Sequence, residues 1–317
     1  MRSLQSKIRF AALVLAFCLL LSGCGLPASA DGAGSKLQSG PSASAKDFVP
    51  YAAPPMATVE FHEDQAKGKN GIKIDLSSVA EGYAAVSAVS DKRLKLQVLY
   101  GDLTYTYNIA SDGTPSFFPL QCGNGHYAFR VMENISDKKY AQAYRTECDV
   151  VLLDEFQPFI RPSDYSMYDS DSACVQKAAE LASSCSTPLE VVSAVYKFVT
   201  KTIRYDDAKA ASVTSIYMPD VDDTLATRKG ICFDYAALTA AMLRSQGIPT
   251  KIIFGYVAPD DLYHAWNMFY TEESGWVTVK FEVSANSWNR VDLTFAAGGA
   301  SAAFVGDGSN YTEVYFY

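Results

Sequence analysis

TLATRKGICFDYAALTAAMLRSQGIPTKIIFGYV, residues 224–257, is the stretch that decides the fold. From residue 232 to residue 246, apolar and small side chains occupy nearly every side of a helical projection, which predicts a helix buried on all faces. Gly247, Ile248 and Pro249 end that helix, and the apolar run 252–257 predicts a buried strand.

Cys232 stands at the start of the predicted helix. Unpaired backbone N–H groups and the positive end of the helix dipole favour a thiolate at that position. Gly230 allows a tight turn before it, so that a substrate carbonyl could approach the sulfur and nearby N–H groups could face a developing oxyanion. We therefore expect Cys232 to be a nucleophile. The alternative is a cysteine that serves as a small apolar core residue.

His264 begins a strand-like segment, 264–270, 32 positions after this cysteine. A histidine beside aromatic residues can be purely structural. After a helix that begins with cysteine, it is a candidate base that deprotonates Cys232 and later donates a proton to the leaving amine. Such a pair needs a third group that holds the imidazole in its productive tautomer.

Three motifs resemble the transglutaminase-like superfamily, and they occur in the family's order and spacing: GICFDYA at 230–236, LRSQGIP at 243–249 and HAWN at 264–267. The resemblance covers about residues 185–297. It implies a papain-like α+β fold, in which the helix carrying cysteine packs on an antiparallel sheet that carries histidine and aspartate.

The third residue of the implied triad follows a tryptophan in the family pattern, W-x-x-aliphatic-D-P-T, and two tryptophans compete for this place. Four positions after Trp276, where the pattern has aspartate, stands Lys280, which cannot accept the imidazole N–H. Four positions after Trp288 stands Asp292, which we therefore assign as the third residue of the triad.

This assignment makes residues 276–283 an inserted hairpin strand. Leu293 stands where the family has proline, and Glu282 is the reserve candidate. The alternative for Asp292 is an exposed aspartate near a turn.

The N-terminus predicts export. A basic lead, Arg2, Lys7 and Arg9, precedes an apolar run at 10–21 that is too short to span a bilayer and is typical of a signal peptide. The sequence LSGC ending at Cys24 resembles the bacterial lipobox. This implies cleavage after residue 23, lipid on Cys24 and an extracytoplasmic protein anchored to the bacterial cell membrane. The alternative is an ordinary signal peptide with a chance cysteine.

Four segments are expected: the signal peptide at 1–23, the lipidated cysteine with a disordered linker at 24–56, an accessory β domain at 57–160 and a transglutaminase-like domain at 161–317. Ser, Ala, Gly and Pro dominate the linker. Alternating apolar runs separated by turn signals predict an antiparallel sheet or small sandwich in the accessory domain. Its tyrosines could line a carbohydrate or peptide groove, or could be cross-strand pairs.

Helices are expected in the last segment at 173–182 and from Pro188, the second with a hydroxyl cap at Ser186 or Thr187 and an early acid at Glu190. Residues 206–223 predict a loop. Its acids could bind calcium, but they match no EF-hand spacing, which favours a solvated loop.

Composition excludes several partners and sites. The formal charge is -8, and lipoprotein processing would remove three basic residues and leave about -11. The sequence contains no cluster of lysine and arginine that would bind phosphate backbones, so we do not expect nucleic acid as a partner. No CxxC pair occurs, and the three histidines, His62, His126 and His264, are widely separated, so we expect no zinc site and no cofactor.

Five cysteines follow Cys24, an odd number that leaves at least one thiol unpaired: Cys122, Cys148, Cys174, Cys185 and Cys232. Cys122 and Cys148 could form a disulfide, but the sequence does not choose among the three pairings of the four cysteines other than Cys232.

The function expected from these features is a thiol acyl-transfer enzyme on the cell surface that acts on extracellular peptide, protein or cell-wall amides through Cys232, His264 and Asp292. Transfer to water gives a peptidase or amidase, and transfer to an amine gives crosslinking. The abundance of water outside the cell slightly favours hydrolysis. The rival interpretation is a non-catalytic binding or scaffold lipoprotein that uses the same fold.

Overall fold

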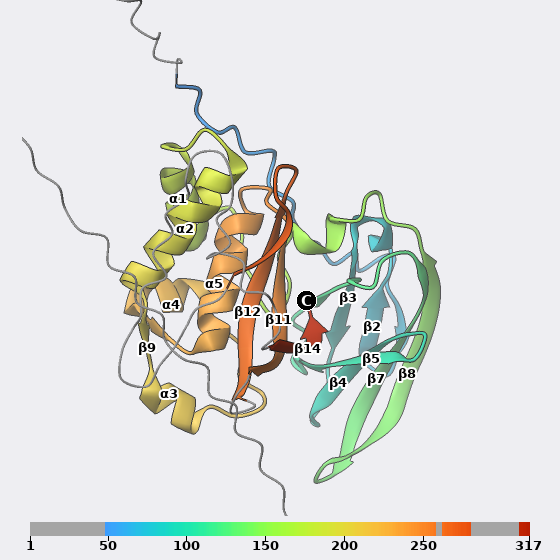
Figure 1. Ribbon diagram of the computed structural model, residues 1–317. Coiled ribbons are helices and arrows are strands. Elements are labelled where there is room, and N and C mark those ends of the chain that lie inside the picture. The colour runs from blue at the N-terminus through green and yellow to red at the C-terminus, as the bar shows by residue number, and fades with distance from the viewer. Residues whose placement is uncertain (1–47, 258–261, 280–310) are drawn as a thin grey trace, which may run out of the picture. The chain divides into compact units, whose positions relative to one another are not determined.

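The computed structural model describes residues 48–257, 262–279 and 311–317, and residues 48–317 group into one compact unit (Figure 1). Cys24, Glu282 and Asp292 lie outside the described residues. Within the described part of the chain, no helix has both the length and the apolar character needed to cross a membrane.

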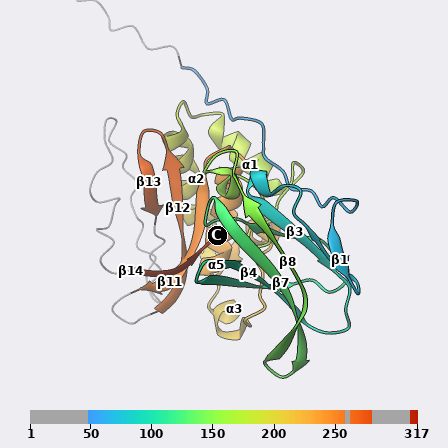
Figure 2. The same cartoon turned by 90° about the vertical axis from the view of Figure 1, so that its right-hand side faces the viewer.

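Two four-stranded antiparallel sheets make up the N-terminal half, so the predicted β-rich region is confirmed. One sheet has the order β1 (Lys67–Lys69), β2 (Ile72–Asp75), β3 (Tyr83–Ala88), β6 (Ser116–Pro119). The other has the order β5 (Leu103–Ile109), β4 (Leu94–Tyr100), β7 (Gly125–Ser136), β8 (Lys139–Val150). Two short 3₁₀ turns are η1 (Val79–Glu81) and η2 (Gln157–Phe159). Figure 2 shows β7 and β8 as a long hairpin.

A shared apolar core joins the two sheets, because alternate residues of each sheet face inward. Leu96 and Phe129 from one sheet and Ile74 and Phe118 from the other are buried in it. The predicted alternation thus produces a sandwich-like packing. The proposed boundary between residues 160 and 161 stays a prediction.

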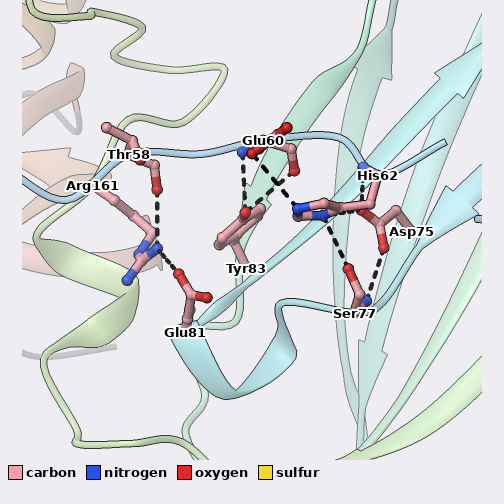
Figure 3. Close-up of polar contacts among 8 residues, drawn as sticks. All are labelled: Thr58, Glu60, His62, Asp75, Ser77, Glu81, Tyr83 and Arg161. Atoms are coloured by element: carbon pink, nitrogen blue, oxygen red, sulfur yellow. Dashed lines mark hydrogen bonds and ion pairs between the residues drawn. The ribbon is translucent and has the colours of Figure 1, made fainter. Parts of the chain in front are cut away.

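Polar contacts hold the segment before β1 onto the first sheet (Figure 3). The buried carboxylate of Asp75 accepts hydrogen bonds from the backbone N–H groups of His62 and Ser77, each at 2.8 Å. Burial alone would raise the pKa of Asp75, but the hydrogen bonds from Ser77 and His62 lower it. Nearby, the buried Arg161 guanidinium donates to the Thr58 carbonyl at 3.1 Å. The segment is therefore fixed at two points.

The C-terminal half combines helices with an antiparallel sheet, which confirms the predicted α+β class. The helices are α1 (Ala173–Ala182), α2 (Pro188–Thr202), α3 (Asp207–Ser212), α4 (Val221–Thr227) and α5 (Cys232–Arg244). The sheet has the order β13 (Gly275–Val279), β12 (Leu262–Thr271), β11 (Thr250–Val257), β14 (Tyr311–Phe316). Two short strands, β9 (Arg204–Tyr205) and β10 (Lys229–Gly230), pair in parallel. In Figure 1, α1, α2, α4 and α5 lie on one side of this sheet.

The predicted start of α2 is confirmed. Thr187 is the N-cap residue, its side chain accepts the backbone N–H of Glu190, and Pro188 occupies the first turn.

The predicted loop at 206–223 is wrong, because it contains α3 and the start of α4. Asp206 caps α3 by accepting the N–H of Lys209, and Asp220 caps α4. Asp222 accepts the N–H groups of Ala173 and Cys174 at the start of α1, each at 2.9 Å. These acids therefore act as helix caps.

Helix α5 is buried on all faces, as predicted. Ala236 and Ala240 pack against Ile252 and Ala265 of the sheet. On the other side, residues such as Leu238 and Met242 join a core with α1 and α2, and both are 0% exposed. The small alanines let the helix approach the sheet closely, which fixes its first turn against β12.

All five cysteines in the described residues are free thiols, including Cys122 and Cys148.

Candidate active site

Cys232 is the first residue of α5. Ile231 before it has an extended backbone and serves as the N-cap residue. The backbone N–H groups of Ala265, on β12, and of Phe233 donate to the sulfur of Cys232, which is partly exposed. The thiol is thus held between the positive end of a helix and the strand that carries His264.

The turn before Cys232 packs closely against the first turn of α5. The residue in the left-handed region of this turn is Arg228, with φ 56°, and not Gly230. At Gly230 a Cβ atom would lie 2.5 Å from the Cβ of Asp234, so only glycine fits against the first turn of α5. Gly230 was expected to allow a tight turn, but close packing against Asp234 is the reason for a glycine at this position.

Asp234 is a residue that the sequence analysis missed. Its side chain is 0% exposed and accepts hydrogen bonds from the Ile231 N–H at 2.7 Å, from Lys209 Nζ at 3.0 Å and from the Tyr217 hydroxyl. An acid at the third helical position commonly accepts the N-cap N–H, so the position of Asp234 after the expected helix start could have indicated this role. Asp234 joins the first turn of α5 to the segment that carries α3.

The protonation of Cys232 differs from the expectation. Burial raises the pKa of the Cys232 thiol above its ordinary value, the N–H groups of Ala265 and Phe233 lower it, and the charge of Asp234 raises it. The net direction is upward, whereas the helix start alone predicted a stabilised thiolate. Attack on a carbonyl therefore requires a base that removes the proton as the reaction proceeds.

Cys232 and His264 line the same cavity, which has a volume of about 580 Å³. His264 lies near the start of β12, opposite Gly255 of β11, and its ring stacks at 6.5 Å from that of Trp266. The structure therefore brings these two predicted residues to one cavity. The predicted third residue, Asp292, lies outside the described residues.

Asn267, the last residue of the HAWN motif, fixes the helix against the strand. It is fully buried, and its side-chain amide donates to the carbonyls of Ala236 on α5, at 3.0 Å, and Lys251 on β11, at 3.2 Å. The Tyr196 hydroxyl donates to its amide oxygen at 3.4 Å. These bonds tie β12, the strand that carries His264, to α5, the helix that begins at Cys232.

No group of three or more His, Cys, Asp or Glu residues suited to a metal ion occurs among the described residues. The described residues that line the cavity also include no Lys, Arg, Asp or Glu. A thiol and an imidazole are thus the reactive side chains that this part of the chain brings to the cavity.

Residues 175–281 match the family model described as the transglutaminase-like superfamily. A 175-residue stretch is 26% identical to an uncharacterized protein of Mycobacterium leprae and covers 52% of this chain and 55% of that protein. A 72-residue stretch is 38% identical to a protein-glutamine gamma-glutamyltransferase of Pseudomonas aeruginosa and covers 19% of this chain and 11% of that enzyme. The chain thus spans about half the length of the first relative and about a tenth of the second.

Among solved structures, red sea bream transglutaminase aligns with a TM-score of 0.29 and 12% identity over 63% of this chain and 48% of that one. Residues 175–281 of the chain are a core domain of the transglutaminase-like superfamily.

Proposed function

We propose that this protein is a thiol acyl-transfer enzyme that acts on peptide or protein amides, with Cys232 as nucleophile, His264 as base and Asp292 as the group that orients His264. The observation that carries the proposal is that Cys232, at the N-terminus of a buried helix, and His264, on the adjacent strand, line one cavity. A thiol alone is a weak nucleophile, and a neighbouring imidazole is the usual means of activating it.

The reaction proceeds in two halves. His264 takes the thiol proton as the Cys232 sulfur attacks the amide carbonyl, and the oxyanion forms near the N–H groups at the start of α5. The C–N bond then breaks, His264 gives its proton to the leaving amine, and a thioester remains on Cys232. Water or a second amine attacks the thioester and restores the thiol. We expect hydrolysis to dominate because water is abundant outside the cell.

The same proposal includes the location of the enzyme. Lipid on Cys24 would anchor the chain to the outer face of the bacterial cell membrane, and the substrates would be extracellular peptides, proteins or cell-wall amides. Labelling cells with a radioactive fatty acid tests this part: label should enter the wild-type chain and be absent from Cys24→Ala.

Mass spectrometry tests the chemistry. A peptide library that contains glutamine is incubated with a labelled primary amine and with wild type, Cys232→Ala, His264→Ala or Cys148→Ala. Cys148 is a matched control because it is a partly exposed free thiol like Cys232, and it does not line the cavity. New peptide termini or deamidation indicate hydrolysis, and incorporated label indicates transfer. Either activity should persist in Cys148→Ala and vanish in the other two variants. Activity that survives Cys232→Ala would contradict the proposal, and inactivity of the wild type would favour the non-catalytic binding module.

A further inference from the structure

The cavity beside Cys232 has a wall of aromatic rings. Phe233 directly follows the nucleophile, and its ring meets Tyr165 at 5.3 Å and Phe254 at 4.9 Å. Tyr263 stacks on Phe254 at 6.1 Å, and Tyr317 meets Tyr165 at 4.5 Å. Because each ring is supported by another, the wall is preformed and not a loose set of side chains.

A sixth ring, Tyr217, closes the wall from the segment 207–218, which contains α3 and the loop after it. Tyr217 lines the cavity, its hydroxyl donates to Asp234, and Lys209 lies 4.6 Å above its ring. The far side of the segment is also held, because Asn108 of β5 donates to the Ser215 carbonyl at 3.2 Å. Contacts on both sides thus fix the position of the Tyr217 ring.

Among the described residues, none that carries a full charge lines the cavity. The described lining residues include no lysine, arginine or carboxylate. The carboxylate closest in sequence to Cys232, Asp234, is fully buried and already engaged by Lys209, Tyr217 and the Ile231 N–H. Against these described walls, a charged substrate side chain would lose its hydration without meeting an opposite charge, whereas an uncharged ring would exchange water for aromatic contacts.

We propose that this cavity binds an uncharged aromatic side chain of the acyl-donor peptide, next to the amide that Cys232 attacks, and that Tyr217 is a specificity-determining residue. That the bound peptide is an acyl donor rests on the proposed function. The volume of about 580 Å³ accommodates a ring together with part of the peptide backbone, within the range of about 300–1,000 Å³ usual for ligand pockets.

The test begins with binding, so that it does not depend on catalysis. Full-length Cys232→Ala protein is titrated calorimetrically with capped peptides that differ at one position: Phe, Leu, Glu or Lys. The Phe peptide should bind at least about 10-fold more tightly than the Glu and Lys peptides. Equal affinities, or tighter binding of a charged peptide, would overturn the inference whatever the catalytic result.

Variants of Tyr217, made in the same Cys232→Ala background, test whether this residue causes the preference for the Phe peptide. Tyr217→Phe keeps the ring and loses the hydrogen bond to Asp234, so the preference for Phe should persist. Tyr217→Leu removes the ring, and the preference should fall by about 5- to 10-fold. Tyr140→Leu, on β8 and outside the cavity lining, is the matched control and should change nothing. An equal loss in Tyr217→Leu and Tyr140→Leu, or an unchanged preference in Tyr217→Leu, would refute the role of Tyr217.

Turnover of the same peptides by the wild type separates the two claims. If the aromatic peptide binds best but no peptide is cleaved or aminated, the proposed function fails and the binding inference stands. If all peptides react at the same kcat/KM, the inference fails and the proposed function stands.

Discussion

Replacing Asp234 with alanine should lower the free energy of unfolding by about 3 kcal/mol. The carboxylate is fully buried and accepts three hydrogen bonds, from Lys209, Tyr217 and the Ile231 N–H. Removing one partner of a buried ion pair costs about 3–5 kcal/mol. Lys209 is 26% exposed and regains part of its hydration, which puts the expected value at the lower end of that range.

Urea denaturation followed by tryptophan fluorescence measures this loss. Asp234→Asn keeps one acceptor oxygen for the Ile231 N–H and should lose about half as much. Lys177→Ala is the matched control, because it breaks an ion pair whose two side chains are 31% and 67% exposed and should cost less than about 1 kcal/mol. If the free energy of unfolding of Asp234→Ala lies within about 1 kcal/mol of the wild-type value, Asp234 does not hold the segment 207–218 against α5.

Asp234 also acts on the thiol, which a purely structural role would not predict. Burial is the largest cause of the raised pKa of Cys232, and the charge of Asp234 adds to it. Asp234→Asn should therefore lower the pKa of Cys232 and increase the rate of its alkylation at pH 8, although the protein is less stable. An unchanged alkylation rate in this variant would contradict the electrostatic coupling.

The other predictions concern protonation and the link between helix and strand. Because burial raises the pKa of Cys232, the resting thiol should react with iodoacetamide at pH 7 more slowly than free cysteine, with a rate that still rises above pH 9; a rate that is flat between pH 6 and 9 would instead indicate a preformed thiolate. His264→Ala should lower turnover by about 10²- to 10⁴-fold. Asn267→Leu leaves the buried carbonyl of Ala236 and the partly buried carbonyl of Lys251 without this donor and should cost about 2–4 kcal/mol in urea denaturation, with loss of activity. Burial raises the pKa of Asp164 to about 6, so the folded state disfavours its charged form at neutral pH. Asp164→Asn should then stabilise the protein by about 2–3 kcal/mol at pH 7.5, and the gain should disappear as the pH falls toward about 4. Asp75→Asn should behave in the opposite way: because the pKa of Asp75 is lowered, this variant should be less stable at pH 7, and its deficit should shrink as the pH falls below about 4. Stability curves from pH 3 to 8 for both variants check the two signs.

Local patterns were enough to predict the elements that position Cys232. The run of apolar and small residues from 232 to 246 specifies a helix buried on all faces, and the apolar run after Pro249 specifies a buried strand. Thr187 and Pro188 likewise mark the start of α2, because a cap is a contact within one turn. Such features depend on neighbours in the sequence, which is why they can be recognised there.

Short helices and contacts between distant segments account for the features that the sequence did not indicate. Helices α3 and α4 have 6 and 7 residues, too few for an apolar period to stand out, and Asp222 caps a helix 48 positions away from it. The pKa of Cys232 depends on how deeply the fold buries the sulfur and on the charge of Asp234, and the helix start alone indicated neither.

The N-terminal sheets and the transglutaminase-like core share the aromatic wall of the cavity. Tyr317 belongs to the core of the sheets, where its ring meets Tyr105 at 5.7 Å and Tyr107 at 5.4 Å, and it also lines the cavity beside Cys232. Tyr165 has the same double role, since it meets Tyr107 at 5.6 Å and Phe233 at 5.3 Å. Because closely packed rings resist independent movement, we expect a substitution in the core of the sheets to alter the shape of the cavity. The first half of the chain therefore helps to form the cavity beside Cys232, because two of the rings that line the cavity pack against it.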